Sequence, residues 1–491
     1  MTSNPRDEPR DKPPAEPPSA NANEETDLLS GTLTRQALLK TGAAVGGGLL
    51  LAGPASARSV FITQKRVSIN FWTWHHISQV PTENGRDRIK AAFEKANPGV
   101  TLNVKLFPYP DYLTALKTAV PAGSAGDVLG LQNGAMVRQY RPYLATLNDL
   151  AEKRMGKNWD KAHIKKAITG PLKTNNWPKK SDEYWWLPAE VAVLGAQWYW
   201  ADVFEKVGVT VPKNYGQLKA ASDKLRSAGY IPTAWGAKDL WPNPDYLIVY
   251  ASQFQPGVVE AAELGKRKFT STPIVAALEF MARTVRDNLY NIGPFGTTAY
   301  PEAYISMFAA KKAAMINTGA HNVSLAGTDG AQENWRAFLF PHIPNAPVRN
   351  WHKGLKSGIP VDTGPGASRV IFDVGYLLSM RKDLKGAKRD AAFSFLQFYC
   401  GPRGQRINSF WTQPSLKAVH ISGFSNAGFN RMLNWHFQVA EFGERREFLF
   451  PETRAALDTA IVSVCVNGAD ARTELAKVDV AAAAARAKAG G

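Results

Sequence analysis

The apolar and polar residues of the chain form short, regular patterns that switch between the period of a strand and that of a helix. Residues 67–74, VSINFWTW, are rich in apolar, β-branched and aromatic side chains, which is typical of a strand. Residues 84–97 place Ile89 and Phe93 on one face, as expected of an amphipathic helix. Residues 100–107, VTLNVKLF, alternate again as a strand does. This order predicts a βαβ unit with a parallel strand pair and a right-handed crossover.

The same alternation continues to the end of the chain. Further strands are predicted at 127–131, 313–317, 335–340 and 370–380, and further helices at 136–152, 214–229, 387–398 and 478–489. Asp111 is expected to cap one more helix, and Asn214 with Gln217 resembles a capping box. Residues 184–200, YWWLPAEVAVLGAQWYW, indicate an extended segment that passes from one block to the next. We therefore predict an α/β fold of two lobes, in which helices cover a mostly parallel sheet.

The length of the chain agrees with two lobes, because 491 residues are too many for a single hydrophobic core. The first lobe is predicted to comprise residues 58–190 and 336–412, and the second lobe residues 191–335 and 413–491. Each lobe then takes two separate stretches of sequence, so several crossing segments must join the lobes.

The N-terminal residues differ in composition from the rest. Residues 1–33 are polar and proline-rich, which predicts disorder. In residues 34–57, two basic residues precede an apolar run that ends in Ala-Ser-Ala, which is typical of an export signal and its cleavage site. The signal resembles the twin-arginine type, except that Gln36 replaces the second arginine, so the general secretory route stays open. No cysteine that could carry a lipid anchor lies near the expected cleavage site, and we therefore expect a freely diffusing protein of the periplasm.

The formal charge of the chain is +17, and it becomes +19 once the five basic and seven acidic residues of positions 1–57 are removed. Such a charge favours acidic partners or surfaces. The basic residues are scattered and accompany no nucleic-acid-binding motif, so we expect no nucleic acid partner. Cys400 and Cys465 could pair or remain buried thiols. Adjacent His75 and His76 point to opposite sides of a strand, and no Cys/His spacing predicts zinc, so neither a metal nor a cofactor is expected.

Several different short motifs follow one another along residues 65–480, and their order is characteristic. They include FEKANPGV at 93–100, Gly126-Asp127-Val128, Leu187-Pro188, and FAAKKAAM at 308–315. Together they resemble the extracellular solute-binding proteins of bacterial ABC transporters, in the maltose- and oligosaccharide-binding family. The chain departs from that pattern at Trp200, where the family has asparagine, and at Lys311, where glycine is usual.

The resemblance implies a type II periplasmic-binding-protein fold, in which crossover strands join two α/β lobes around a ligand cleft. It also implies a sugar or oligosaccharide as ligand, hinge closure on binding, and ABC permease subunits as partners. We expect a monomer without enzymatic activity. Aromatic rings would stack on the apolar faces of sugars, and polar side chains would bind the hydroxyls. The candidate ligand-binding residues, most of which follow predicted strands, are Trp74, His75, Gln132, Asn133, Glu190, Trp235, Trp241, His321, Asp373 and Arg454.

Other interpretations stay open. For Trp74, Trp235 and Trp241 the alternative is a place in the hydrophobic core, and for Arg454 it is a solvated surface. A secreted carbohydrate-active enzyme would need paired carboxylates or a metal site, and no such pattern is evident. A free-standing secreted lectin would share the fold without a transporter. Within the family, the ligand could also be a polyol, a phosphorylated polyol or an acidic sugar.

Overall fold

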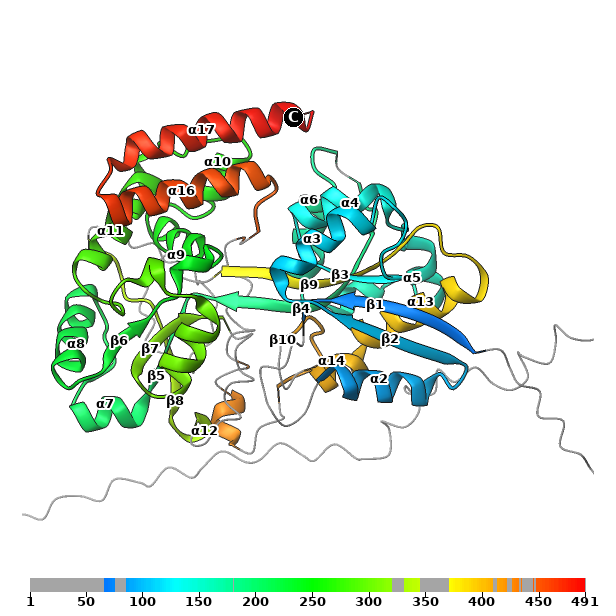
Figure 1. The fold of residues 1–491 in the computed structure, drawn as a ribbon, viewed down its shortest axis with the longest axis horizontal. Helices are drawn as coiled ribbons and strands as arrows, with labels where there is room; N and C mark the ends of the chain where they lie inside the picture. The colour runs from blue at the N-terminus through cyan, green and yellow to red at the C-terminus, as the bar shows by residue number, and fades with distance from the viewer. Residues whose placement is uncertain are drawn as a thin grey trace, which may run out of the picture. The chain divides into compact units, whose positions relative to one another are not determined.

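The computed structural model describes most of the chain after residue 65 (Figure 1). The described residues are 66–75, 85–179, 181–319, 331–344, 371–408, 413–421, 426–431, 434, 445 and 447–490. All of them belong to the compact unit Gln64–Gly491. The predicted leader, its export signal and the candidate ligand-binding residue His321 lie outside the described residues.

A six-stranded sheet with the order β10–β4–β9–β3–β1–β2 forms the first lobe. Its strands are β1 Val67–Thr73, β2 Val100–Leu106, β3 Val128–Leu131, β4 Leu187–Leu194, β9 Ile371–Met380 and β10 Gln413–Pro414. β1 pairs in parallel with β2, which confirms the predicted βαβ unit. The prediction of a mostly parallel sheet is wrong, however, because the β3–β9, β4–β9 and β4–β10 pairs are antiparallel. β4 leaves this sheet for the second lobe and β9 returns from it, so the two strands run in opposite directions.

A four-stranded sheet with the order β6–β7–β5–β8 forms the second lobe. Its strands are β5 Ala196–Trp200, β6 Ile231–Ala234, β7 Ala313–Thr318 and β8 Trp335–Leu339. The single residue Gly195 separates β4 from β5 and has a φ of 100°, which only glycine adopts without strain. The chain therefore changes sheets at Gly195, as predicted for residues 184–200 (Figure 1).

Strand pairing differs from the predicted lobe boundaries at two places. β8 pairs with β5 in the second sheet, although residues 336–412 are predicted to lie in the first lobe. β10 pairs with β4 in the first sheet, although residues 413–491 are predicted to lie in the second lobe. Both strands are short, and their membership depends on partners more than 100 residues away in the sequence. The other lobe boundaries stay predictions.

Helices cover both faces of the first sheet, with α3, α4 and α6 on one face and α2, α13 and α14 on the other (Figure 1). The helices of the first lobe are α2 Gly85–Ala96, α3 Tyr109–Ala119, α4 Ala135–Tyr140, α5 Asn148–Met155, α6 Lys165–Asn175, α13 Gly386–Cys400 and α14 Pro402–Asn408. The prediction of one helix at 136–152 is wrong, because the Pro142 turn separates α4 from α5. Asp111 lies in the first turn of α3 rather than at its cap, which is Pro108.

The second lobe is richer in helices than the first. They are α7 Ala201–Val207, α8 Tyr215–Ser227, α9 Asn243–Phe254, α10 Val258–Glu263, α11 Thr272–Arg286, the π-helical segment η5 Ala299–Ala309, α12 Ala331–Asn334, α16 Pro451–Asn467 and α17 Ala471–Lys488. The predicted cap of α8 is confirmed, because the Asn214 side chain accepts a hydrogen bond from the Gln217 N–H. None of the helices in the described ranges is both long and apolar enough to cross a membrane.

Each lobe has its own aromatic core. In the first lobe, Phe395 of α13 packs against Phe71 of β1 and Phe93 of α2, at ring-centroid distances of 5.0 and 5.1 Å. In the second lobe, the Trp200 and Trp335 rings lie 5.7 Å apart. Trp200 also contacts Lys311, the second departure from the family pattern. The Lys311 ammonium group lies 4.4 Å from the centre of the Trp200 ring and pairs with Asp202, so the two unusual residues contact each other.

Candidate functional site

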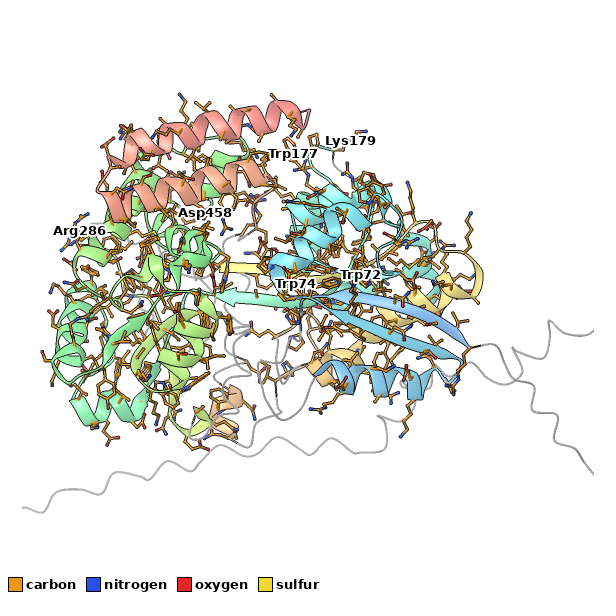
Figure 2. All side chains as sticks on the ribbon, viewed as in Figure 1. Trp72, Trp74, Trp177, Lys179, Arg286 and Asp458 are labelled. Carbon is orange, nitrogen blue, oxygen red and sulfur yellow. The ribbon has the colours of Figure 1, made fainter. Side chains whose placement is uncertain are left out.

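Six candidate ligand-binding residues meet at one edge of the first sheet. Trp74 and His75 directly follow β1, and Gln132 and Asn133 directly follow β3, which is parallel to β1. β9 runs the other way, so its beginning, with Asp373, lies at the same edge. Glu190 of β4 is opposite Tyr376 of β9 in the strand register. Figure 2 marks Trp74 at the end of β1. We call these six residues, together with Tyr376, the first-lobe edge.

A close contact between His75 and Glu190 and a stacked ring organise the middle of this edge. His75 Nε2 lies 2.9 Å from Glu190 Oε1, and Glu190 is only 6% exposed. The His75 ring stacks on the Tyr376 ring at 4.6 Å, and the Tyr376 hydroxyl is hydrogen-bonded to Thr73 Oγ1. Burial raises the pKa of Tyr376 well above its usual value, so its hydroxyl keeps its proton. Glu190 and His75 are thus held in fixed positions by each other and by β1 and β9.

Tyr376 is a residue that the sequence prediction missed. The strand at 370–380 is predicted, but its alternation does not indicate which of its side chains lies at the edge. A usable signal is Gly130 in the buried strand β3, since a glycine inside a strand often marks a close approach. A Cβ atom at Gly130 would lie 2.1 Å from the Tyr376 hydroxyl oxygen, so Gly130 provides the space that Tyr376 occupies.

Half-buried aromatic side chains extend the first-lobe edge. The Trp74 ring contacts the rings of Tyr109 and Tyr376 at centroid distances of 5.5 and 5.1 Å. The Tyr109 hydroxyl donates a hydrogen bond of 2.5 Å to Gln132 Oε1. An indole face thus lies beside an amide whose orientation is fixed, a combination that suits a ligand with both an apolar face and polar groups.

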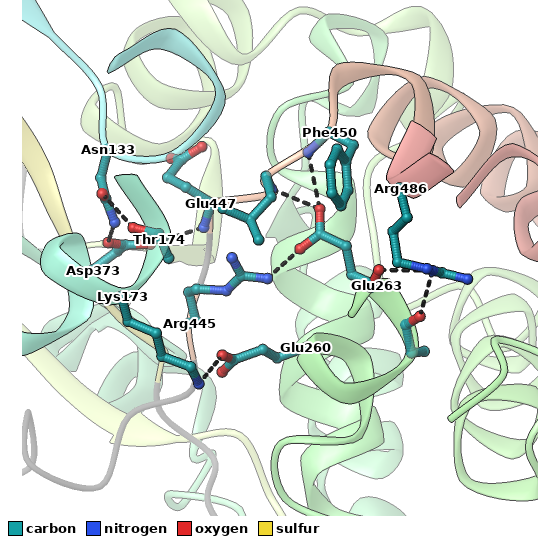
Figure 3. Close-up of polar contacts among 12 residues, drawn as sticks. Asn133, Lys173, Thr174, Glu260, Glu263, Asp373, Arg445, Glu447, Phe450 and Arg486 are labelled. Carbon is teal, nitrogen blue, oxygen red and sulfur yellow. Dashed lines mark hydrogen bonds and ion pairs between the residues drawn. The ribbon is translucent and has the colours of Figure 1, made fainter. Parts of the chain in front are cut away.

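Asp373 and Asn133 form a buried pair that continues away from the edge (Figure 3). Asp373 Oδ1 accepts hydrogen bonds from Asn133 Nδ2 at 2.6 Å and from the Val374 N–H at 2.8 Å. Asp373 Oδ2 accepts one from the Glu447 N–H at 2.8 Å, and Thr174 Oγ1 donates to Asn133 Oδ1 at 2.9 Å. Since Asp373 is only 4% exposed, its described contacts orient Asn133 and residue 447.

Burial, followed by the nearby negative charge of Glu447, raises the pKa of Asp373 to about 6. The unfolded chain loses this proton at about pH 4. Between these two values the folded protein binds more protons than the unfolded chain, so this group lowers stability as the pH rises.

The variant Asp373→Asn should remove that pH-dependent loss. We expect the wild type to lose on the order of 2 kcal/mol of unfolding free energy relative to the variant between about pH 4 and 7. Urea unfolding at several pH values measures this difference, with the exposed Asp390→Asn as control. A difference that is constant with pH, or that changes in the opposite direction, would contradict the assignment.

Of the second-lobe candidates, Trp235 lies in the hydrophobic core. It is 2% exposed, and its ring packs against Tyr246 and Tyr290 at 4.6 and 4.7 Å. Trp235 directly follows the short strand β6, and the composition of the loop does not reveal that this side chain is buried. Trp235 is therefore a residue of the hydrophobic core, which was the alternative interpretation, and we no longer count Trp235 among the ligand contacts.

Trp241 is half-buried and belongs to a stack of three rings. Its ring is stacked on Tyr304 with centroids 6.1 Å apart and planes at 24°. Tyr304 is in turn stacked on Tyr300 at 4.5 Å and 5°. The Tyr304 hydroxyl accepts a hydrogen bond from Thr318 at the end of β7. We call these three residues the second-lobe stack; both of its tyrosines were missed by the sequence prediction.

Arg454 of α16 holds the loop that carries Trp241. Its Nη2 donates to the carbonyl oxygens of Leu240 and Trp241 at 3.3 and 3.2 Å, and its Nε donates to Asp458 Oδ2 at 3.0 Å. Leu240 has a φ of 63°, a strained value for this residue type. Burial raises the pKa of Asp458, which lies on α16 (Figure 2), to about 6. Arg454 is thus tied to the Trp241 loop rather than freely solvated.

The described residues contain no group of three or more His, Cys, Asp or Glu side chains that could hold a metal ion. Cys400 and Cys465 are both buried free thiols, so they do not form the disulfide that the sequence left open. Burial raises the pKa of each thiol, which keeps both in the protonated, unreactive form.

Residues 82–406 match the family model of the bacterial extracellular solute-binding proteins. The chain belongs to this family. Among curated relatives of this solute-binding protein is a protein of Brucella abortus named as a binding protein, 25% identical over 228 residues. That match covers 43% of this chain and 52% of the Brucella protein, about half the length of each. A protein of Mesorhizobium japonicum, named as sugar-binding and periplasmic, is 32% identical over 132 residues, which are 26% of this chain and 28% of that protein.

Solved structures with a similar fold match nearly the whole solute-binding protein. A chitin oligosaccharide binding protein has a TM-score of 0.67 at 16% identity, covering 86% of this chain and 100% of that one. The maltose-bound T. maritima MalE3 has a TM-score of 0.65 at 16% identity, covering 85% and 99%. At this identity the likeness concerns the fold alone. It confirms the predicted type II periplasmic-binding-protein fold of two α/β lobes.

Proposed function

We propose that this solute-binding protein captures a carbohydrate in the periplasm and delivers it to the permease of an ABC importer. The observation that carries the proposal is the second-lobe stack, in which the half-buried Trp241 ring is stacked on Tyr304 with the two planes at 24°. A pyranose ring has an apolar face that packs on such a plane, and its hydroxyls need polar partners. Gln132 and His75 of the first-lobe edge would supply them, and the buried Asn133 would support the strand end that carries Gln132. The structural neighbours named for a chitin oligosaccharide and for maltose support the same ligand class.

Transport would depend on closure of the two lobes. A ligand that contacts Trp74 on the first lobe and Trp241 on the second gains both sets of contacts only when the lobes close on it. It therefore shifts the population toward the closed state. β4 and β9, which join the two sheets as an antiparallel pair, would form part of the hinge. The permease would recognise the closed state; we further propose that the protein is monomeric and reaches the periplasm by means of its N-terminal signal.

The carboxylates favour a binding protein over a glycoside hydrolase. Glycoside hydrolysis uses one carboxyl group as acid and another as base or nucleophile, and both must reach the scissile bond. Glu190 is paired with His75, and the Asp373 carboxylate accepts three N–H hydrogen bonds. Both are nearly inaccessible to solvent, so we propose that the protein has no hydrolytic activity.

A thermal-shift screen with neutral sugars, acidic sugars and polyols tests the proposal and identifies the ligand class. A ligand present at about 100 times its dissociation constant should raise the unfolding free energy by about 2.7 kcal/mol. The ligand should be recovered chemically unchanged. If no carbohydrate or polyol in the screen stabilises the protein, the proposed function is wrong.

The variant Trp241→Ala should raise the dissociation constant of the ligand found in that screen by at least about tenfold, because it removes the stacking surface. Trp241→Phe is the matched control, since it keeps an aromatic ring and should lose much less affinity. Isothermal titration calorimetry measures both. Equal affinities for the wild type and Trp241→Ala would exclude Trp241 from the site.

A further inference from the structure

One ion pair joins a helix of the first lobe directly to a helix of the second. Lys173 of α6 pairs with Glu260 of α10 (Figure 3). α6 contacts the first-lobe edge, because Thr174, the next residue, donates a hydrogen bond to Asn133. α10 belongs to the second lobe, where Val258, Val259 and Ala262 are part of the hydrophobic core. The Lys173–Glu260 pair therefore connects the two lobes beside the proposed ligand-binding residues.

The same short helix has a second carboxylate that binds a connecting segment. Glu263 is completely buried and pairs with Arg445, and its Oε1 accepts hydrogen bonds from the Leu449 and Phe450 N–H groups at 2.6 and 3.1 Å. We call residues 447–450 the strap. Arg486 of α17 donates to the Glu263 carbonyl oxygen at 2.8 Å, which fixes the C-terminal end of α10.

The strap is also bound to the first lobe. The Phe448 carbonyl oxygen accepts a hydrogen bond from the Ala135 N–H at 3.2 Å, and the Leu449 carbonyl oxygen accepts one from Arg138 Nη1 at 3.0 Å. The Phe450 ring packs edge-on against the Trp177 ring at 5.1 Å. Since the Glu447 N–H binds Asp373, the strap contacts the same carboxylate that orients Asn133.

These contacts suggest which arrangement of the lobes the ion pair favours. Lys173 precedes Thr174, which is hydrogen-bonded to Asn133 of the first-lobe edge. The strap binds Asp373, which is also hydrogen-bonded to Asn133. A rotation that moves this edge away from the second lobe would separate Lys173 from Glu260. We propose that the Lys173–Glu260 ion pair stabilises the ligand-bound arrangement of the lobes and thereby sets ligand affinity without contacting the ligand. This inference rests on the proposed function for the identity of the ligand and for the closure of the lobes on it.

The charges around Lys173 and Glu260 keep Glu260 ionised, as an ion pair between the lobes requires. Burial by itself would raise the pKa of Glu260, but Arg445 and Lys173 lower it below the usual value, so Glu260 is ionised at neutral pH. The side chains of Lys173 and Glu260 are 60% and 23% exposed, so salt screens the pair. Its contribution should therefore be modest and should decrease as the ionic strength rises.

The variants Lys173→Met and Glu260→Gln test the proposal, with Lys165→Met as control, since Lys165 is an exposed lysine on the same helix. Calorimetry would use maltotriose and N,N′,N″-triacetylchitotriose as probes. Each variant should raise the dissociation constant about two- to fivefold. The double variant should weaken binding no more than either single variant, and the difference from the wild type should vanish in about 1 M salt. Unchanged or tighter binding in Lys173→Met would overturn the proposal.

Hydrogen exchange in the ligand-free protein tests the ion pair even if neither oligosaccharide binds. The Ala135 and Glu447 amides join the first lobe to the strap. Opening of the lobes should release them, so their exchange should be about two- to fivefold faster in Lys173→Met and Glu260→Gln, but not in Lys165→Met. Equal exchange in all four proteins would overturn the proposal. If the wild type binds neither probe while exchange follows this pattern, the ligand class is wrong and the ion pair still acts between the lobes.

Discussion

The variant Gly130→Ala should destabilise the protein and disrupt the first-lobe edge. A Cβ atom at Gly130 would lie 2.1 Å from the Tyr376 hydroxyl oxygen and 2.5 Å from two carbons of its ring. Tyr376 is completely buried, so its rigid ring has no open space to enter. Either β3 and β9 must separate or Tyr376 must leave its position. We expect an unfolding free energy lower by about 3 kcal/mol, measured by urea unfolding, which is at the upper end for added core volume.

Ligand affinity should fall together with stability in Gly130→Ala. Tyr376 supports the His75 ring from one side and bonds Thr73, so its displacement releases the His75–Glu190 pair. Gly99→Ala is the matched control. Gly99 precedes β2, a methyl group added there would meet no heavy atom within 4 Å, and its φ is not positive, so this variant should be neutral or slightly stabilised. If Gly130→Ala is as stable as Gly99→Ala, the contact between Gly130 and Tyr376 does not exist in solution.

The elements that could be predicted from sequence are those with strong local patterns. The β1–α2–β2 unit has a regular period and a clear helix end, and its predicted parallel pairing is confirmed. The crossing at Gly195 was predictable because a long apolar, extended segment cannot stay within one short sheet. The orientation of β9 was not predictable in this way, because it depends on the route of the chain through the second lobe.

Prediction of the candidate site from sequence is limited in the same way, because long-range packing is not visible in local patterns. Trp74, His75, Gln132 and Asn133 were found because parallel strands end at one edge, which is a rule about topology. Trp235 was assigned by the same rule and is instead buried, since the direction of a loop after a strand depends on its packing. Tyr304 and Tyr300 were missed because they come from the irregular segment η5, which meets Trp241 only in three dimensions.

The connecting network around α10 has no sequence signature either. Glu263 and Arg445 are 182 residues apart, and nothing in the local composition of either segment indicates a buried pair. Charged residues are rarely buried completely unless they are paired, so the complete burial of Glu263 identifies it as a structural residue only once the fold is known. Its consequences for stability are therefore best tested directly.

The variant Glu263→Ala should be the most damaging single substitution considered. It leaves the guanidinium group of Arg445 buried without its partner and removes the acceptor of the Leu449 and Phe450 N–H groups. Breaking a buried ion pair from one side costs about 3–5 kcal/mol. We expect a loss of that size in urea unfolding, and faster hydrogen exchange of those N–H groups in the strap, directly before α16. Glu260→Gln, three residues earlier on the same helix, should lose less than about 1 kcal/mol.

A second substitution separates the two causes of the loss in Glu263→Ala. In Glu263→Gln the side chain can still accept hydrogen bonds from the strap, so the remaining destabilisation reports the unpaired charge of Arg445. Adding Arg445→Met removes that charge and should restore a large part of the stability, because a buried ion pair can often be replaced by apolar groups at little cost. If Glu263→Gln/Arg445→Met is no more stable than Glu263→Gln, the hydrogen bonds to the strap, rather than the ion pair, determine the stability of this junction between the lobes.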